Sequence, residues 1–421
     1  MEEVKVFQKK KLFFVFTSAG KPVWTRYGDA VDLSTFIGSL AAILFNFQNY
    51  YTNSSDALRY LRTSDMLVVF LCKEALFYVV ICKISKNKQN PIKETLESLH
   101  QQLQNLHIKV ISTLTNNITS TLQKRPNFDA RNLMGGTHSA LDTLVRTSAM
   151  TPHFLEGFMP VRLHYDLRNE VYQAFKNNMH EDILYAILMT PNFIIYRYCR
   201  KGNSLHYSDV SLLSNLLASY NSLRSASSWT PICLPQYSDE GFVYACITFI
   251  ANSQISITLI SENSNAFKDL KNSGDIIEAE LTKIKSQLED CIKQMPYSVS
   301  TCGIKEVKHF LYCSRGLDQY TMSGVNPSTR DFLPEIKKQA YKRLLKRYDT
   351  AYHLSIFSDY YKGNFTRIDI YRNEQILCIR TLDYTLLVSF SPLLSRNTVY
   401  NVSTQLLRWI KQEEPSLFIV K

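Results

Sequence analysis

The sequence lacks the patterns that mark most metal sites and catalytic centres. Its nine cysteines form no CxxC pair, which favours reduced thiols inside a cytosolic protein over zinc sites or disulfides. The nine histidines never fall in HExxH or another metal spacing, and no GxSxG marks a nucleophile. Gly20-Lys21-Pro22 is not a phosphate loop, because the upstream glycine and the following Ser or Thr are missing. We therefore expect no catalytic residue, no metal and no cofactor.

A Ser–His–Asp site assembled from distant residues stays open. It would require a deep pocket that holds a histidine or carboxylate with a perturbed pKa.

No apolar stretch is long enough to span a bilayer. The longest one, Met66 to Cys82, is interrupted by Lys73-Glu74, so each half falls far short of the roughly 20 residues that a spanning helix needs. We interpret this stretch as a buried β-hairpin whose turn carries the charges. The residues before Leu12 include acidic side chains and no apolar signal core, so we do not expect secretion.

The composition is that of a folded, basic protein. A chain of 421 residues with 45% hydrophobic and 12% aromatic residues predicts two or three domains. The net charge of +11 suits nucleic acid, an anionic membrane or an acidic partner. No RNP motif, zinc finger or helix-turn-helix accompanies the charge, so nucleic acid ranks last.

The segment Lys11 to Tyr27 predicts how the fold begins. Leu12 to Phe16 is too short for a helix and is rich in aromatic and β-branched residues, Ser18 to Pro22 breaks the run, and Val23 to Tyr27 resumes it. Asp29 or Asp32 can cap a helix directly afterwards. A hairpin followed at once by a long helix is how longin and roadblock modules begin.

The order strand, strand, helix, further strands, helix can be laid on the chain three times. We predict three modules of α/β (α+β) structure, each a mainly antiparallel sheet with helices packed on it, over residues 1–150, 151–297 and 298–421. Within them we expect helices at about Ala30–Tyr50, Leu96–Leu122, Phe154–Asn178, Asn265–Met295 and Phe332–Tyr348, and a strand near Leu354. The apolar three-and-four spacing from Leu96 to Leu122 also allows a coiled coil.

The helix that ends at Tyr50 is apolar on more than one side. Leu33, Ile37, Leu40 and Leu44, with Phe36 and Phe47, make one stripe. Val31, Ile43 and Phe45 lie elsewhere, and small residues such as Gly38 and Ala41 keep part of the surface thin. The chain itself covers both sides, or one side packs on the sheet and the other on a partner.

Two other features of the sequence each allow two interpretations. In the helix at Phe332–Tyr348 we place Leu333, Ile336, Ala340, Leu344 and Tyr348 on one half and a basic cluster on the other. That cluster, Lys338, Lys342, Arg343 and Lys346, is a solvated face or a dock for anionic lipid. Trp229, before Pro231, caps the core of the second module or anchors a partner.

Four segments carry a resemblance to a known family. They are FVFTSAGKPVWTRYGD from Phe14, SSWTPICLP from Ser227, VKHFLYCS from Val307 and LLRWIKQEE from Leu406. Together they resemble the SAND-type vacuolar fusion family, the monensin-sensitivity proteins, over almost the whole chain.

The resemblance implies a tri-longin subunit of a guanine-nucleotide exchange factor, without covalent chemistry, for the late-endosomal Rab GTPase. It implies a heterodimer with the calcium-caffeine-zinc-sensitivity tri-longin protein and recruitment from the cytoplasm to late-endosomal, lysosomal or vacuolar membranes that contain anionic phosphoinositides. By analogy, the platform for GTPase and partner would comprise Lys21, Trp24, Arg26, Ser34, Ile37, Gly38, Ala41 and Trp229. The alternative is a non-catalytic longin subunit of a coat, adaptor or tethering complex.

Overall fold

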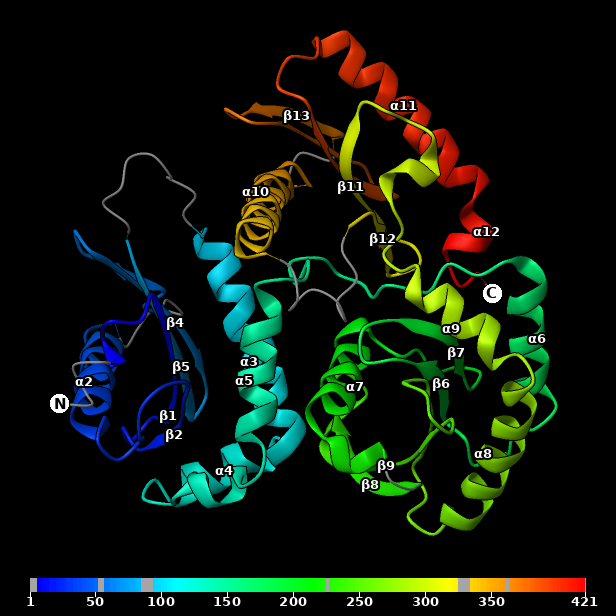
Figure 1. Cartoon of the computed structure of the whole chain (residues 1–421). Coiled ribbons are helices and arrows are strands. Elements are labelled where there is room, and N and C mark those ends of the chain that lie inside the picture. Colours follow the sequence, from blue (N-terminus) through cyan, green and yellow to red (C-terminus); the bar gives the residue numbers. More distant parts are fainter. Residues whose placement is uncertain are drawn as a thin grey trace. The chain divides into compact units, whose positions relative to one another are not determined.

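The computed structural model describes residues 6–51, 57–84, 94–224, 227–324, 334–359 and 363–420. It contains three five-stranded antiparallel sheets, with strand orders β2-β1-β5-β4-β3, β7-β6-β10-β9-β8 and β12-β11-β15-β14-β13 (Figure 1). The three orders are the same pattern repeated, which confirms three longin-like modules. Each sheet lies inside one of the three predicted residue spans, whereas the boundaries at 150 and 297 stay a prediction.

The first module contains β1 (Lys11–Thr17), β2 (Pro22–Thr25), α2 (Ser34–Tyr50), β3 (Tyr60–Arg62), β4 (Met66–Lys73), β5 (Leu76–Lys83), α3 (Leu96–Leu114), α4 (Asn117–Lys124), η1 (Ala130–Met134) and α5 (His138–Ser148). The second contains α6 (Tyr165–Lys176), β6 (Tyr185–Met189), β7 (Ile194–Cys199), α7 (Tyr207–Ser219), η2 (Asn221–Arg224), β8 (Ser228–Leu234), β9 (Ser238–Phe249), β10 (Ser256–Ser261), α8 (Phe267–Thr282) and α9 (Lys285–Lys293). The third contains η3 (Val299–Cys302), β11 (Val307–Ser314), β12 (Gln319–Met322), α10 (Glu335–Asp359), β13 (Phe365–Ile370), β14 (Gln375–Arg380), β15 (Tyr384–Phe390), α11 (Arg396–Gln412) and α12 (Glu414–Leu417).

The first sheet is covered on both faces. α2 buries its stripe with Phe14, Phe16 and Val79 on one face, and α3 packs with Phe13, Tyr78 and Val80 on the other. Because successive residues of a strand point to opposite faces, the apolar run Leu12–Phe16 of β1 fills both cores. The predicted opening hairpin is confirmed, and so is the hairpin of β4 and β5, whose turn carries Glu74.

Four predicted elements are wrong. The long helix after Leu96 breaks at Thr115, which has a φ of 56° that a continuing helix cannot adopt. This break rules out the continuous coiled coil. α8 and α9 likewise replace one helix. The residues from Phe158 to Leu163 are extended rather than helical, and α10 runs on through Leu354, where a strand was expected.

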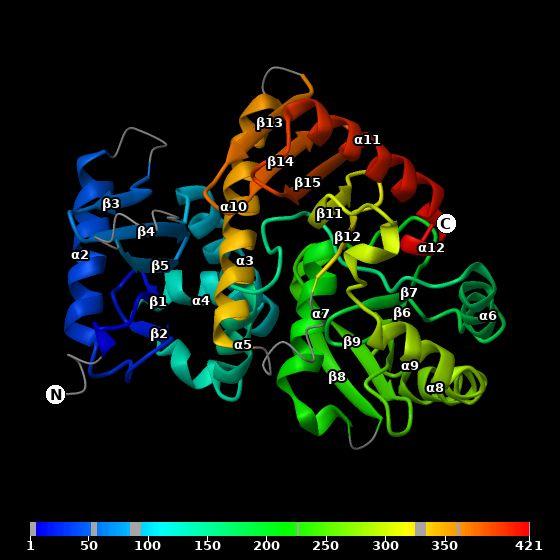
Figure 2. The same cartoon turned by 45° about the horizontal axis from the view of Figure 1, so that its top comes forward.

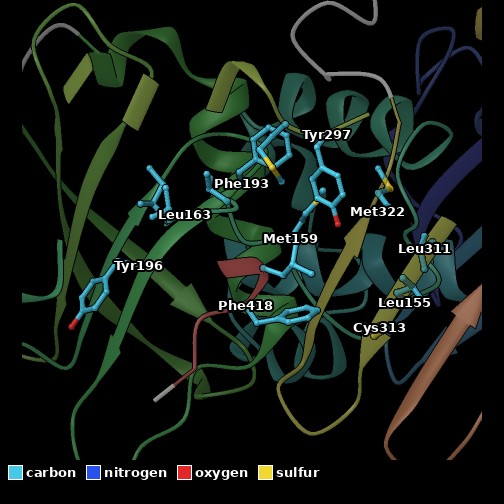
Figure 3. Packing of buried hydrophobic residues seen from close by; sticks show 14 of the residues in the cluster. Leu155, Met159, Leu163, Phe193, Tyr196, Tyr297, Leu311, Cys313, Met322 and Phe418 are labelled. Atoms are coloured by element: carbon cyan, nitrogen blue, oxygen red, sulfur yellow. The ribbon is translucent and has the colours of Figure 1, made fainter. Parts of the chain in front are cut away.

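The second and third modules belong to one compact unit, residues 154–237 with 242–421, and share one apolar core. The connector from Phe158 joins their sheet edges: Phe158 forms a parallel bridge to Gln319 of β12, and Pro160 forms one to Ile194 of β7. Figure 3 shows the result, with Met159 of the connector and Phe418 of the C-terminal segment among side chains of both modules. The connector and the C-terminal segment thus join two modules into one body.

All nine cysteines lie in the described ranges, and none of them is in a disulfide bond. No helix in the described ranges combines the length and apolar content needed to cross a membrane.

Candidate functional site

The outward side of α2 is the best candidate for a functional surface. A helix advances 100° per residue, so Leu33, Ile37, Leu40 and Leu44 fall on one side, and all four are buried against the first sheet. The opposite side is a strip of small or polar residues. These are Ser34, Thr35, Gly38, Ser39 and Ala42, all exposed.

Bulky apolar side chains border this strip. Ile43 is 42% exposed on one flank, Phe45 is 58% exposed on the other, and Val31 and Tyr50 are exposed at the two ends. We call Val31, Ile43, Phe45, Tyr50 and the strip between them the α2 outer surface. Its thin centre lets another backbone approach closely, and each large side chain covered there contributes on the order of 1.5 to 3 kcal/mol.

The open edge of the first sheet extends this surface. β3 is the last strand in the order, and its residues Tyr60, Leu61 and Arg62 are all exposed. β2, at the other edge, packs against η1. Leu58, just before β3, packs on the same core as α2, so the open edge borders that helix. Among the described residues, no strand pairs with the outer side of β3.

The structure separates the predicted platform residues of α2 and corrects two of them. Ser34 and Gly38 are exposed on the α2 outer surface. Ile37 is 0% exposed and lies in the sheet-facing core. Ala41 is 8% exposed, because the turn at Gly20 packs on it. Ile37 therefore packs in the module's own core, and Ala41 packs beneath the turn at Gly20.

The hairpin residues are corrected in the same way. Trp24 is 1% exposed and belongs to the core on the face opposite α2, so it is not a contact residue. Lys21 and Arg26 are half-buried: the Lys21 ammonium donates to the Asn127 carbonyl oxygen, and the Arg26 guanidinium stacks 5.0 Å from the Tyr27 ring centroid.

Trp229 is half-buried in the second module. Its ring stacks on Tyr244 with centroids 5.6 Å apart and packs on Phe267 at 5.5 Å. These contacts support its role in capping the core. Part of the ring remains accessible, so its role as an anchor stays a prediction.

The basic residues of α10 are less exposed than a solvated face would be. Lys338, Lys342, Arg343 and Lys346 are all half-buried. The sheet-facing side is formed by Tyr341, Leu345, Tyr348 and Tyr352, and not by Ile336 and Ala340, which are exposed. Leu333 lies outside the described residues. The sequence therefore predicted the wrong side of α10 as the apolar one for Ile336 and Ala340, although Tyr348 was placed correctly. The prediction relied on aliphatic residues, whereas tyrosine makes most of the contact with the sheet.

Two histidines, the half-buried His107 and the buried His309, have strongly lowered pKa values. Burial, with a smaller effect of Lys73, lowers the pKa of His107 to about 4, and burial lowers the pKa of His309 to about 4. Nδ1 of each histidine lies at hydrogen-bond distance from a tyrosine hydroxyl, 3.1 Å from that of Tyr78 and 3.2 Å from that of Tyr348. His309 also has a hydrogen bond with the Ser323 backbone, and the Ser323 hydroxyl accepts from the Phe310 N–H at 2.9 Å. These contacts tie both histidines to neighbouring strands and helices of their modules.

One group in the described residues has metal-like spacing that the sequence does not reveal. His180, Asp182 and Asp269 bring ligand atoms within 4.8 Å of one another. Asp269 is exposed, and the Asp182 backbone N–H donates to His180 Nδ1 at 3.3 Å. Exposed groups of this kind are common without a metal, and we base no site on this one.

Comparison of the chain with known protein families agrees with the three-module architecture. Models of the first, second and third longin domains of FUZ, MON1 and HPS1 match residues 11–144, 181–276 and 306–414. The fold thus defines a protein of three longin domains.

Relatives cover nearly the whole chain. A vacuolar fusion protein MON1 homolog from Oryza sativa subsp. japonica is 27% identical over 98% of this chain and 75% of its own length. The human vacuolar fusion protein MON1 homolog A is 27% identical over 98% of this chain and 61% of its own. Protein SAND from Takifugu rubripes is 28% identical over 98% and 76%. The chain belongs to the MON1/SAND family.

Proposed function

We propose that this chain is a vacuolar-fusion trafficking protein, and more specifically a subunit of a heterodimeric guanine-nucleotide exchange factor. It promotes GDP release from the late-endosomal Rab GTPase and so drives endosome maturation and fusion with the vacuole or lysosome. Its partner is the calcium-caffeine-zinc-sensitivity tri-longin protein. Family membership and the three-longin architecture support this proposal.

The single observation that carries the proposal is the α2 outer surface. A surface helix normally turns its polar side to water, yet Ile43 and Phe45 are 42% and 58% exposed beside a strip without bulky side chains. The open β3 edge, with Tyr60 and Leu61 exposed, offers backbone hydrogen-bonding groups next to it. A second longin module that pairs there covers both features and completes the GTPase platform.

The exchange mechanism needs no general base. A factor accelerates GDP release when it binds the nucleotide-free GTPase more tightly than the loaded one, and linkage then weakens nucleotide binding by the same factor. Exchange is therefore driven by a protein surface that binds the two states of the GTPase with different affinity. This agrees with the structural contacts of His107 and His309.

Release of fluorescent GDP from the late-endosomal Rab, with the co-expressed heterodimer, tests the proposal. We expect acceleration by the native heterodimer and loss of it in the variant Ile43→Asp/Phe45→Asp. Ile276→Asp is the matched control, because Ile276 is 50% exposed on α8 of the second module. No acceleration over the GTPase alone would defeat the exchange function and leave a non-catalytic longin subunit.

The proposal includes peripheral recruitment to late-endosomal or lysosomal membranes. The support is the basic side of α10, where each cation close to an anionic surface is worth about 1 kcal/mol.

A further inference from the structure

One end of the third module presents exposed aliphatic side chains close together. Gln375, the first residue of β14, pairs with Ile370 at the end of β13 and with Phe390 at the end of β15. The β13–β14 turn and the loop from β15 to α11 therefore leave the sheet at the same end. Ile370 is 62% exposed there, and Leu393, in the loop, is 92% exposed.

The loop is fixed in a way that holds Leu393 outward. Gln375 is only 2% exposed. Its side-chain Nε2 lies at hydrogen-bond distance from the carbonyl oxygens of Ser391, Pro392 and Leu394, at 3.1, 2.9 and 2.8 Å. A buried amide that bonds both sides of Leu393 restricts the loop backbone. Because Leu393 is exposed to water, its side chain contributes almost no burial free energy to its own module.

Three exposed cations lie on the same turn as the aliphatic pair or on the adjoining strand and helix. Lys308 is exposed, and its Nζ donates to the Asn373 carbonyl oxygen of the β13–β14 turn at 3.2 Å. Arg372 is exposed in the same turn, and Arg396 is exposed at the first position of α11.

The acidic residue of the turn does not offset these charges. Glu374 is engaged by Arg347 and accepts from the Ser389 hydroxyl at 2.8 Å. The start of α11 adds positive backbone dipole. Tyr400, one turn after Arg396 on the same side of α11, is 42% exposed, and tyrosine favours the interface between apolar and aqueous phases.

We propose that this end of the third module is a membrane-contact surface. Leu393 and Ile370 enter the outer layer of an anionic bilayer, and Lys308, Arg372 and Arg396 bind lipid head groups. Two aliphatic tips ringed by cations match an anionic lipid surface, whereas a stable protein interface needs a broad, well-packed area. The inference rests on the proposed membrane recruitment but not on exchange. It shares no residue with the predicted lipid face of α10, which lies on the face of the sheet opposite α11 (Figure 2), although Arg347 of α10 reaches the β13–β14 turn at Glu374 and Tyr371.

Flotation of the purified full chain tests the proposal, with phosphatidylcholine–phosphatidylserine vesicles and with phosphatidylcholine alone. We expect binding to the mixed vesicles, and Leu393→Asp to weaken it on the order of tenfold. Leu382→Asp is the matched control, because Leu382 is 79% exposed in the β14–β15 turn at the opposite end of the same sheet. That control should bind like the native chain. Lys308→Glu/Arg372→Glu should weaken binding and reduce its salt dependence.

Unchanged binding of Leu393→Asp, equal losses with Leu382→Asp, or no vesicle binding by the native chain would overturn the proposal. The same would follow if Leu393→Asp spared vesicle binding but abolished heterodimer formation, because the surface would then be a protein interface. GDP release in solution, without vesicles, separates the two claims. Its absence in the native heterodimer would defeat the exchange function alone, and Leu393→Asp should leave it unchanged.

Discussion

Gly20 and Ala41 pack the first hairpin against α2. A Cβ placed on Gly20 would lie 3.3 Å from the Ala41 Cβ and 3.8 Å from the Gly38 Cα. Gly20 also has a φ of +75°, which L side chains rarely adopt. Ala41, a small residue on the inner flank of α2, therefore packs against the chain's own turn, whereas the small residues Gly38 and Ala42 on the outer flank stay exposed.

The two sides of α2 should respond differently to the same charge. Ile37→Asp places a carboxylate in a fully buried site and should destabilise the first module by roughly 3 to 5 kcal/mol. Ile43→Asp should change stability by less than about 0.5 kcal/mol while weakening the heterodimer. Urea denaturation followed by partner pull-down measures both effects. Equal destabilisation by the two substitutions would show that the outer surface is covered by the chain itself.

Gly20→Ala should destabilise the first module by about 1 to 2 kcal/mol, because the backbone is left-handed and the contact with Ala41 is tight. Gly38→Ala is the matched control. No atom lies within 4 Å of its added Cβ, and alanine is preferred inside a helix by about 1 kcal/mol. Gly38→Ala should therefore raise the thermal midpoint. It should also weaken partner binding if the thin strip is a contact, and unchanged affinity would remove Gly38 from the platform.

Gly157→Ala should loosen the joint between the second and third modules. Its Cβ would lie 2.9 Å from the Asp318 carbonyl oxygen and 3.0 Å from the carbonyl carbon, and this backbone belongs to the approach to β12. We expect a loss of about 1 to 3 kcal/mol and faster proteolysis near the connector. Gly316→Ala, where nothing lies within 4 Å, should behave like the native chain. A tolerated Gly157→Ala would mean that the connector shifts at little cost.

Asp209 should give the second module an unusual pH dependence. Burial raises the pKa of this carboxyl to about 6, although the backbone N–H groups of Gln236 and Tyr237 oppose the shift. The folded state therefore holds the proton more tightly than the unfolded state, and stability from this residue falls as pH rises from about 4 to about 6.

Asp209→Asn stays neutral and should lack this decline. Its advantage over the native chain, measured by urea unfolding, should grow across that pH window. A constant difference would show that Asp209 does not titrate there.

Charge reversal on α10 tests the predicted lipid face. Changing Lys338, Lys342, Arg343 and Lys346 to Glu should reduce binding to vesicles that contain phosphatidylinositol phosphates by at least tenfold. Lys268→Glu/Lys271→Glu/Lys283→Glu is a control on exposed positions of α8 and of the residue that follows it. Unchanged recruitment of the α10 variant would return that helix to a solvated polar face.

Local patterns predicted the elements that depend on near neighbours. The opening hairpin, the β4–β5 hairpin around Glu74 and the existence of an apolar stripe on α2 follow from periods of two and 3.6 residues. One failure arose where a distant contact competes with local preference. Phe158 to Leu163 has apolar residues that also suit a helix, yet pairing with β7 and β12 makes it extended.

The sequence by itself determined the three-module plan and the apolar excess on α2, because both depend on residue type and spacing along the chain. Only the tertiary structure decided which side of that helix is open. Ile37 and Ile43 have the same side chain, but the sheet covers one and leaves the other exposed. It also decided that Trp24 is core and that Leu393 projects from a loop held by Gln375. Such assignments depend on which surfaces meet across long stretches of chain, and no local pattern encodes that choice.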